Sequence, residues 1–205
     1  MSAVQYTPSP VDFGAPEKFK NWRDGQDLLF WDVLDCKKRF SIHNVPTGAG
    51  KSLAYVVAAL AAGKRAGFLT ESKGLQDQLI GDFGAVGLFD MRGLSNYTCR
   101  ALTEGGLLET LWQKKWGRPT CDVGPCTAGI RCDLKNDGCD YFDDYRKACS
   151  AKLVCTNYAY WIAIHRYGQG LGKFDLLILD EAHAADSQLS AAMSVPDRRA
   201  SWMYF

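Results

Sequence analysis

The sequence has none of the features that mark a membrane-bound or secreted protein, and neither sign of charge dominates it. Its longest apolar run, Leu53–Ala62, is far shorter than the roughly 20 residues that span a bilayer. The N-terminal segment MSAVQYTPSPVDFGAP has neither a basic start nor an apolar core, so it is not a secretory signal. Lys and Arg number 24 against 23 Asp and Glu, which excludes a histone-like polycation. We therefore expect a cytoplasmic protein without a membrane partner.

Cysteine, by contrast, is abundant and unevenly distributed. In a reducing compartment, clustered cysteines indicate a metal or redox site sooner than disulfides. The residues around the cluster are rich in Asp, Gly, Lys and Asn, which is too polar for a core of unligated thiols. Cys36, Cys149 and Cys155 are better explained as ordinary thiols, because free cysteine often behaves as a small apolar residue. The other five cysteines are the candidate metal ligands: Cys99, Cys121, Cys126, Cys132 and Cys139.

Short apolar segments alternate with helical patterns along most of the chain. This alternation predicts an α/β fold with a parallel sheet covered on both faces. The helix expected over 75–83 turns Leu79 and Phe83 inward and leaves Gln76 on its polar side. The expected strands are Phe40–Val45, Arg65–Thr70, Leu153–Thr156 and Phe174–Leu179, and the other expected helices are Lys18–Asp35 and Leu53–Ala62. The segment from about Asn96 to Ala148 breaks this rhythm and is interpreted as an insertion.

The segment Val45-Pro46-Thr47-Gly48-Ala49-Gly50-Lys51-Ser52 has the pattern of a phosphate-binding loop between a strand and a helix. Glycines allow successive backbone N–H groups to converge on an anion, and the following helix adds its positive N-terminus. Lys51 can reach the β- and γ-phosphates of a nucleotide, and the Ser52 hydroxyl can bind Mg²⁺. The general pattern has Gly where this chain has Val45. The predicted loop contacts to ATP are Thr47, Gly48, Ala49, Gly50, Lys51 and Ser52.

A second motif follows the apolar segment Leu176–Leu179, where Asp180, Glu181 and His183 occur within four residues. In parallel α/β sheets, ligands bind at the carboxyl ends of the strands, which would place Asp180 beside the phosphate loop. Asp180 is then a candidate Mg²⁺ ligand, and Glu181 a candidate base for the attacking water. An acidic pair after a strand is more often a solvated loop. The phosphate loop upstream favours the catalytic interpretation, in which His183 could link the nucleotide to the nucleic acid.

Together, PTGAGKS, Asp180-Glu181-Ala182-His183 and the cysteine-rich insertion resemble the iron–sulfur DNA helicases of superfamily 2, the XPD and DinG group. Arg23–Gln26 resembles the adenine-reading element, with Gln26 as the amide that contacts the base. Thr70–Gln78 resembles the motif that contacts single-stranded DNA. The resemblance implies a RecA-like P-loop domain with an iron–sulfur insertion. It divides the chain into a loose lead-in (1–17), a first part of the ATP-binding domain (18–95), the cluster insertion (96–150) and a second part with the DEAH box (151–205).

The resemblance also implies ATP, Mg²⁺ and a [4Fe–4S] cluster as cofactors. It favours Cys99, Cys126, Cys132 and Cys139 as the cluster ligands. Cys121 is the alternative, because its spacing to Cys126 and Cys132 would suit a cluster equally well. Structural zinc is the rival metal, since thiolates bind it too.

The implied function is ATP hydrolysis coupled to movement on single-stranded DNA. Only 22 residues follow His183, so we expect that the chain is a fragment, a split gene or a degenerate copy, or that it works with a separate chain that carries the second motor domain. We expect little activity from this chain alone. The alternative is a non-catalytic module, derived from such a helicase, that binds nucleic acid or a partner. Base stacking could involve a basic and aromatic stretch, which could equally be an amphipathic helix with buried Trp; it consists of Trp112, Lys114, Lys115, Trp116 and Arg118.

Overall fold

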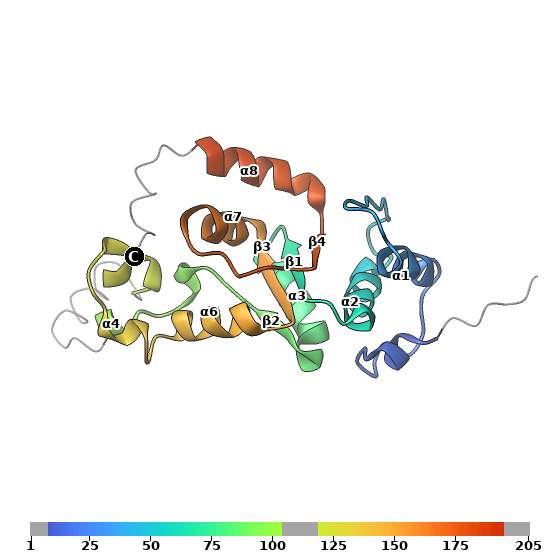
Figure 1. Cartoon of the computed structure of the whole chain (residues 1–205), viewed down its shortest axis with the longest axis horizontal. Coiled ribbons are helices and arrows are strands. Elements are labelled where there is room, and N and C mark those ends of the chain that lie inside the picture. The colour runs from blue at the N-terminus through green and yellow to red at the C-terminus, as the bar shows by residue number, and fades with distance from the viewer. Residues whose placement is uncertain (1–7, 104–118, 195–205) are drawn as a thin grey trace, which may run out of the picture.

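The computed structural model describes residues 8–103 and 119–194, with the side chains described as far as Ala191. Four parallel strands form one sheet in the order β2-β3-β1-β4 (Figure 1). In the middle of the sheet, Phe68 lies opposite Cys155 on one side and Ile178 on the other. The strands are β1 (Ala66–Thr70), β2 (Leu88–Asp90), β3 (Leu153–Asn157) and β4 (Leu176–Leu179). The mixed α/β architecture with an all-parallel sheet is therefore confirmed.

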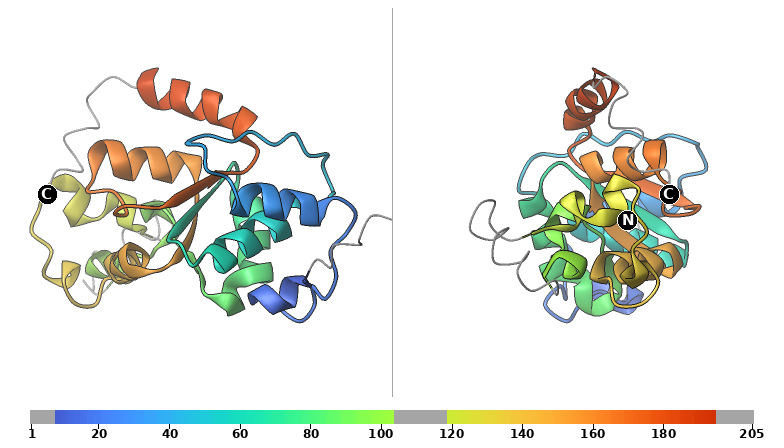
Figure 2. Two further views of the ribbon diagram at one scale, coloured as in Figure 1. Left: turned by 45° about the vertical axis from the view of Figure 1, so that its right-hand side comes forward. Right: turned by 90° about the vertical axis from the view of Figure 1, so that its left-hand side faces the viewer.

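Helices cover both faces of this sheet (Figures 1 and 2). One face packs on α1 (Gln26–Leu34), α2 (Lys51–Ala62) and α3 (Lys73–Phe83). The other packs on α6 (Asp140–Ser150) and α7 (Tyr158–Tyr167), and α8 (Ala185–Ser194) lies against α7. Successive strand residues alternate between the two cores: Leu153 and Cys155 belong to the first core and Val154 to the second. Burial on both faces explains why β1 and β3 have continuous apolar sequences.

The expected strand Phe40–Val45 is wrong. The sheet ends at β4, and residues 40–46 form no regular element. The side chains of Phe40 and Ile42 are 75% and 96% exposed. A strand requires a neighbour that supplies hydrogen bonds, and no described strand lies beside this segment to do so.

The expected helix Lys18–Asp35 is also shorter than the prediction, because α1 begins only at Gln26. The segment before α1 consists of turns. The Trp22 indole N–H stabilises them by donating a hydrogen bond to the carbonyl of Pro8 at 2.7 Å. The helix expected over Leu53–Ala62 forms as part of α2, and that over 75–83 forms as part of α3. The Ser72 hydroxyl caps α3 by accepting a hydrogen bond from the backbone N–H of Leu75 at 3.3 Å.

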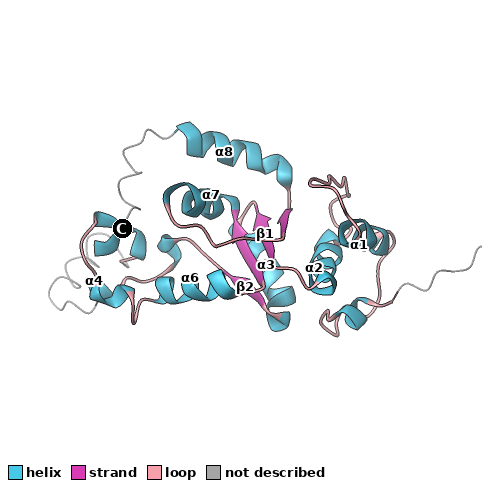
Figure 3. Ribbon diagram, viewed as in Figure 1, coloured by secondary structure: helices cyan, strands magenta, loops and turns pink. Residues whose placement is uncertain are grey.

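Between β2 and β3 the described chain consists mostly of short turns (Figure 3). They precede α6 and are η3 (Leu94–Asn96), α4 (Arg100–Thr103), η4 (Cys121–Val123), η5 (Pro125–Ala128) and η6 (Asp133–Lys135). The basic and aromatic stretch from Trp112 to Arg118 lies outside the described residues. Within the described part of the chain, no helix has the length and apolarity needed to cross a membrane.

Arg65, just before β1, contacts two segments that are distant from it in sequence. Its guanidinium donates to the carbonyls of Ala148 and Ala151 at the end of α6, at 2.9 and 3.0 Å. It also donates to the carbonyls of Leu171 and Lys173 in the segment before β4, at 2.9 and 2.6 Å. One side chain therefore connects the end of α6 and the segment before β4 to the start of β1.

Candidate nucleotide-binding site

The predicted phosphate loop turns sharply and runs directly into α2. Gly48 and Gly50 adopt positive φ angles of 85° and 73°, a region that residues with a Cβ rarely occupy. The backbone N–H of Ala49 closes the turn on the carbonyl of Pro46 at 3.3 Å. Because α2 begins at Lys51, the loop lies at the positive end of a helix dipole. This arrangement suits an anion such as phosphate.

Gln26 holds this loop in place from the start of α1. Its side-chain amide nitrogen donates to the carbonyls of Ala49 and Gly50 at 2.9 and 2.8 Å. Its amide oxygen accepts a hydrogen bond from the backbone N–H of Arg23 at 2.8 Å, and the residue is only 4% exposed. The predicted contact between Gln26 and adenine stays a prediction, whereas its contact with the loop is direct.

We expect Gln26→Ala to weaken ATP binding without altering any residue of the loop. The substitution removes two hydrogen bonds to loop carbonyls and one from the turn at Arg23. At about 1 kcal/mol per neutral bond, the loss corresponds to roughly a tenfold or larger rise in the ATP dissociation constant. Titration with a fluorescent ATP analogue measures it. The control Gln78→Ala, at an exposed position of α3, should bind like the parent; equal affinity for Gln26→Ala would contradict this role.

The two motifs separated by 130 residues meet in space. The Lys51 ammonium forms an ion pair with the Glu181 carboxylate and lies 3.5 Å from Oδ1 of Asp180. Asp180 follows the end of β4 and is 8% exposed. Glu181 adopts a φ angle of +52°, which is uncommon for a residue other than glycine. The structure thus brings Lys51, Asp180 and Glu181 together, and the fourth predicted residue, His183, lies beside Glu181.

The charges in this group reinforce one another. Burial disfavours the Lys51 ammonium, but its hydrogen bond to Glu181 and the charges of both carboxylates outweigh that effect and raise its pKa above the ordinary value. The same hydrogen bond lowers the pKa of Glu181. Lys51 and Glu181 are therefore both charged at neutral pH. His183 is 77% exposed, with Nδ1 3.5 Å from Oε2 of Glu181.

Tyr55 also belongs to the site, although no sequence motif includes it. Its hydroxyl donates to Oδ2 of Asp180 at 2.9 Å and lies 3.2 Å from the Oγ of Ser52. Burial, followed by the charge of Asp180, raises the pKa of Tyr55, so the hydroxyl keeps its proton. Tyr158 donates to the backbone carbonyl of Asp180 at 2.9 Å. The sequence contains one indication of this role: Tyr55 follows Ser52 by three residues, so the two share a helix face.

The start of α3 carries the motif that resembles a contact to single-stranded DNA. Residues 71–74 are exposed, and Lys73 begins the helix. Gln76, expected on the polar side of the helix, is fully buried instead. Its amide nitrogen donates to Oδ1 of Asp90 at 2.5 Å and to the carbonyl of Met91 at 3.1 Å. Gln76 is therefore closed to a ligand, whereas residues 71–74, Asp77 and Gln78 of the motif are exposed.

The five candidate ligand cysteines come together in the insertion. Burial raises the pKa of the Cys99 and Cys126 thiols, and the nearby Cys132 and Cys139 raise it further. Burial also raises the pKa of Cys121, followed by the effect of Cys139 and Cys99. Cys155 is buried in β3, as expected, and Cys149 lies on α6. In the described ranges, no three His, Cys, Asp or Glu side chains are arranged to hold a single metal ion.

Comparison with known proteins gives one distant match. No family model matches the sequence. The chain is 28% identical over 185 residues to the ATP-dependent DNA helicase YoaA of Escherichia coli (strain K12). The chain is thus distantly similar to part of a DNA helicase. The match covers 67% of this chain but only 29% of the helicase, so the chain spans less than a third of that relative.

Proposed function

We propose that this chain is the ATP-binding motor domain of an ATP-dependent DNA helicase, and that it hydrolyses ATP as it moves on single-stranded DNA. The observation that carries the proposal is the meeting of Lys51 with Asp180 and Glu181 at the N-terminus of α2. A glycine-rich loop on a helix N-terminus suits phosphate, and the acidic pair suits a metal and an attacking water. The helicase relative points to the same chemistry.

In this proposal, Thr47, Gly48, Ala49 and Gly50 surround the phosphates with backbone N–H groups. Lys51 exchanges its ion pair with Glu181 for the β- and γ-phosphates. That exchange frees the Glu181 carboxylate to orient the attacking water and accept its proton. His183, beside Glu181, faces solvent and is the proposed connection to the DNA side.

Ser52 and Asp180 fit Mg²⁺, because both carry oxygen donors and the Tyr55 hydroxyl contacts both side chains. When bound, the ion would neutralise charge on the phosphates. Tyr55 holds the Asp180 carboxylate in one orientation, and Tyr158 fixes its backbone carbonyl. Gln26 keeps the loop in its bound shape and is also the proposed contact to adenine.

The insertion at 96–150 would carry an iron–sulfur cluster, within the domain division expected from the resemblance. A [4Fe–4S] cluster requires four thiolates, and the donor set here is entirely thiol. Cys99, Cys126, Cys132 and Cys139 are the set that the resemblance favours. With Cys121, the insertion has five candidate thiols for four positions, so one is in excess. The cluster would supply a rigid, cysteine-bound core to a segment made of short turns.

Single-stranded DNA would lie across the start of α3, where Lys73 is exposed beside the helix N-terminus. A second motor domain would close the nucleotide site. An arginine supplied in trans raises the rate of comparable hydrolases by about 10³–10⁵. This chain alone is therefore expected to hydrolyse ATP slowly.

Glu181→Gln tests this assignment, because it removes the base but keeps a group that can hydrogen-bond Lys51. We expect ATP·Mg²⁺ binding to stay within about threefold of the parent. Single-turnover hydrolysis with single-stranded DNA should fall by about 10²-fold or to background, as for the loss of a general base. The parent is tested alone and with a second-domain chain. If it binds ATP in both cases but DNA stimulates no hydrolysis, the result would favour the non-catalytic alternative. A parent that does not bind ATP would contradict both parts of the proposal.

A further inference from the structure

The backbone of Asp180 is held on both sides by groups outside its own strand. Its N–H donates to the carbonyl of Leu69 in β1 at 2.9 Å. Its carbonyl accepts a hydrogen bond from the Tyr158 hydroxyl, also at 2.9 Å. Tyr158 begins α7 and is only 3% exposed, so this contact is shielded from water. The peptide between Asp180 and Glu181 is therefore held in one orientation.

The conformation of Glu181 follows from that orientation. Its φ and ψ angles of 52° and 47° are left-handed, which a residue with a Cβ keeps only where its surroundings impose it. Its N–H donates back to Oδ1 of Asp180 at 3.1 Å, and its carbonyl accepts from the N–H of Ala184 at 2.9 Å. In this conformation the Glu181 carboxylate reaches the Lys51 ammonium. The direction of the proposed base thus depends on the peptide that Tyr158 holds.

The start of α7 is in turn connected to α3. Asn157 caps α7 by accepting from the N–H of Tyr160 at 2.9 Å, and its amide nitrogen donates to Oε1 of Gln76 at 3.4 Å. Gln76 is fully buried, and its own amide nitrogen is held by Asp90 and the carbonyl of Met91. At 3.4 Å the contact between the two amides is loose, so a small shift of α3 can close or break it.

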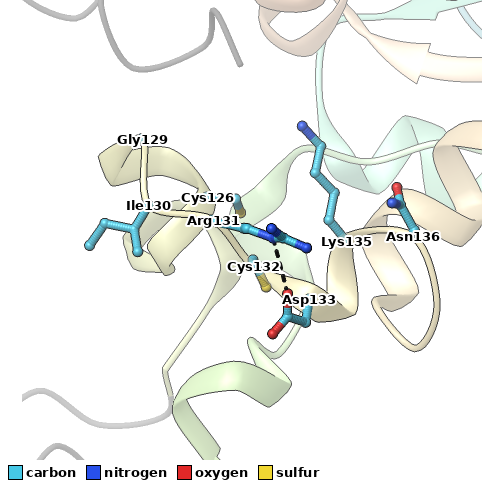
Figure 4. Close-up of a pocket in the computed structure, with 8 residues that line it drawn as sticks. All are labelled: Cys126, Gly129, Ile130, Arg131, Cys132, Asp133, Lys135 and Asn136. Carbon is cyan, nitrogen blue, oxygen red and sulfur yellow. Dashed lines mark ion pairs between the residues drawn. The ribbon is translucent and has the colours of Figure 1, made fainter.

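These contacts lead from the protein surface to the catalytic pair. Gln76 lies one turn into α3 from the exposed residues 71–74, where single-stranded DNA is proposed to lie. Thr70, at the end of β1, lies opposite Asn157, at the end of β3, so α3 and α7 both start at the same edge of the sheet. None of these residues lines the pocket in the insertion (Figure 4). The connection therefore lies outside the insertion.

We infer that Tyr158 is a positioning residue for Glu181, and that the contact between Asn157 and Gln76 couples its position to DNA at the start of α3. The inference rests on the proposed function, which supplies ATP, DNA and the role of Glu181 as base. DNA that pulls on α3 moves Gln76 against Asn157 and shifts the start of α7. Tyr158 carries that shift to the peptide before Glu181. Linkage then requires ATP to change DNA affinity by the same factor by which DNA changes ATP affinity.

Tyr158→Phe tests the positioning role, because it removes one hydroxyl and keeps the buried ring. We expect the ATP dissociation constant to stay within about threefold of the parent. Single-turnover hydrolysis with single-stranded DNA should fall by at least about fivefold, as for the loss of one neutral hydrogen bond that holds a catalytic group. Tyr167→Phe, at the other end of α7, is the control and should hydrolyse like the parent. Hydrolysis at the parent rate, or a loss of ATP binding as large as the loss of hydrolysis, would overturn the positioning role.

Asn157→Ser tests the coupling by equilibrium binding, without any turnover. Serine keeps a cap for α7 but is too short to reach Gln76. Fluorescently labelled oligo-dT is titrated with the protein, with and without a non-hydrolysable ATP analogue, and the ratio of the two dissociation constants measures the coupling. We expect this ratio to differ from one by about fivefold or more in the parent. In Asn157→Ser it should lie within about twofold of one, while the variant binds each ligand alone, and melts, like the parent.

Two results would overturn the coupling. One is a parent that binds oligo-dT and the analogue independently of each other. The other is an Asn157→Ser protein that couples the two ligands as strongly as the parent. A parent that binds neither ligand would instead refute the proposed function, and the inference with it.

Discussion

Lys51→Ala should remove measurable ATP·Mg²⁺ binding. In the proposed complex the Lys51 ammonium exchanges its ion pair with Glu181 for phosphate oxygens. Hydrogen bonds to charged groups contribute about 1.5–3 kcal/mol each, so the loss of this ammonium corresponds to a weakening of roughly 10- to 100-fold or more. The substitution also removes the hydrogen bond from Lys51 that lowers the pKa of Glu181, so that pKa should rise. Isothermal titration calorimetry with ATP and Mg²⁺ measures the affinity.

Lys64→Ala is the matched control for this substitution. Lys64 is exposed just beyond the C-terminal end of α2, whereas Lys51 begins the same helix. The control should bind ATP like the parent. The Lys51→Ala protein should retain the far-ultraviolet circular dichroism of the parent, because the side chain leaves a loop and no core cavity forms. If Lys51→Ala binds ATP as tightly as Lys64→Ala, the loop does not bind phosphate.

Arg65→Ala should cause the largest loss of stability among single surface substitutions. The guanidinium donates to four backbone carbonyls and lies 4.1 Å from the ring centre of Phe174. Its removal leaves carbonyls of α6 and of the segment before β4 without this partner. We expect the free energy of unfolding to fall by about 3 kcal/mol, since hydrogen bonds to charged groups are the strong ones. For a chain of this size, that lowers the melting temperature by roughly 6–12 °C.

Arg65→Lys and Arg39→Ala complete this experiment. A single ammonium cannot reproduce the planar fork that reaches two segments at once, so Arg65→Lys should recover less than half of the loss. Arg39 is exposed and contacts the exposed ring of Phe40, so its removal should change the free energy of unfolding by less than about 0.5 kcal/mol. Equal melting temperatures for Arg65→Ala and Arg39→Ala would show that the carbonyl contacts contribute little.

The parts of the site that could be predicted are those in which neighbouring residues carry the chemistry. Glycines before Lys51 and Ser52, and an apolar strand before Asp180 and Glu181, specify a phosphate loop and an acidic pair from local sequence alone. The acidic pair follows β4 at the carboxyl end of the sheet, where ligands of parallel sheets bind, whereas the loop follows no described strand and is placed by α2. The ion pair between Lys51 and Glu181 is the consequence.

Other features depend on partners that are distant in sequence. From the sequence Gln76 is a polar helix residue, but in the fold its amide donates to Asp90 at the end of β2 and to the carbonyl of Met91 just after it. Tyr55 looks like part of an apolar helix until Asp180 arrives from β4. No sequence motif predicts the role of Arg65, because its partners are backbone carbonyls, which every residue has. The segment Phe40–Val45 has the pattern of a strand, but the pattern does not reveal whether a neighbouring strand is present.

The end of the sheet at β4 has a practical consequence for handling the protein. Its outer edge is paired with no described strand, and Leu177 and Leu179 are 38% and 45% exposed there. Unpaired backbone groups beside apolar side chains are a template on which another chain can add a strand. Two molecules that meet at this edge can extend one sheet into the other, and the contact grows with concentration. Protein concentration therefore becomes a variable to control in every measurement of ATP or DNA binding, because an aggregate formed through β4 would involve the strand that carries Asp180.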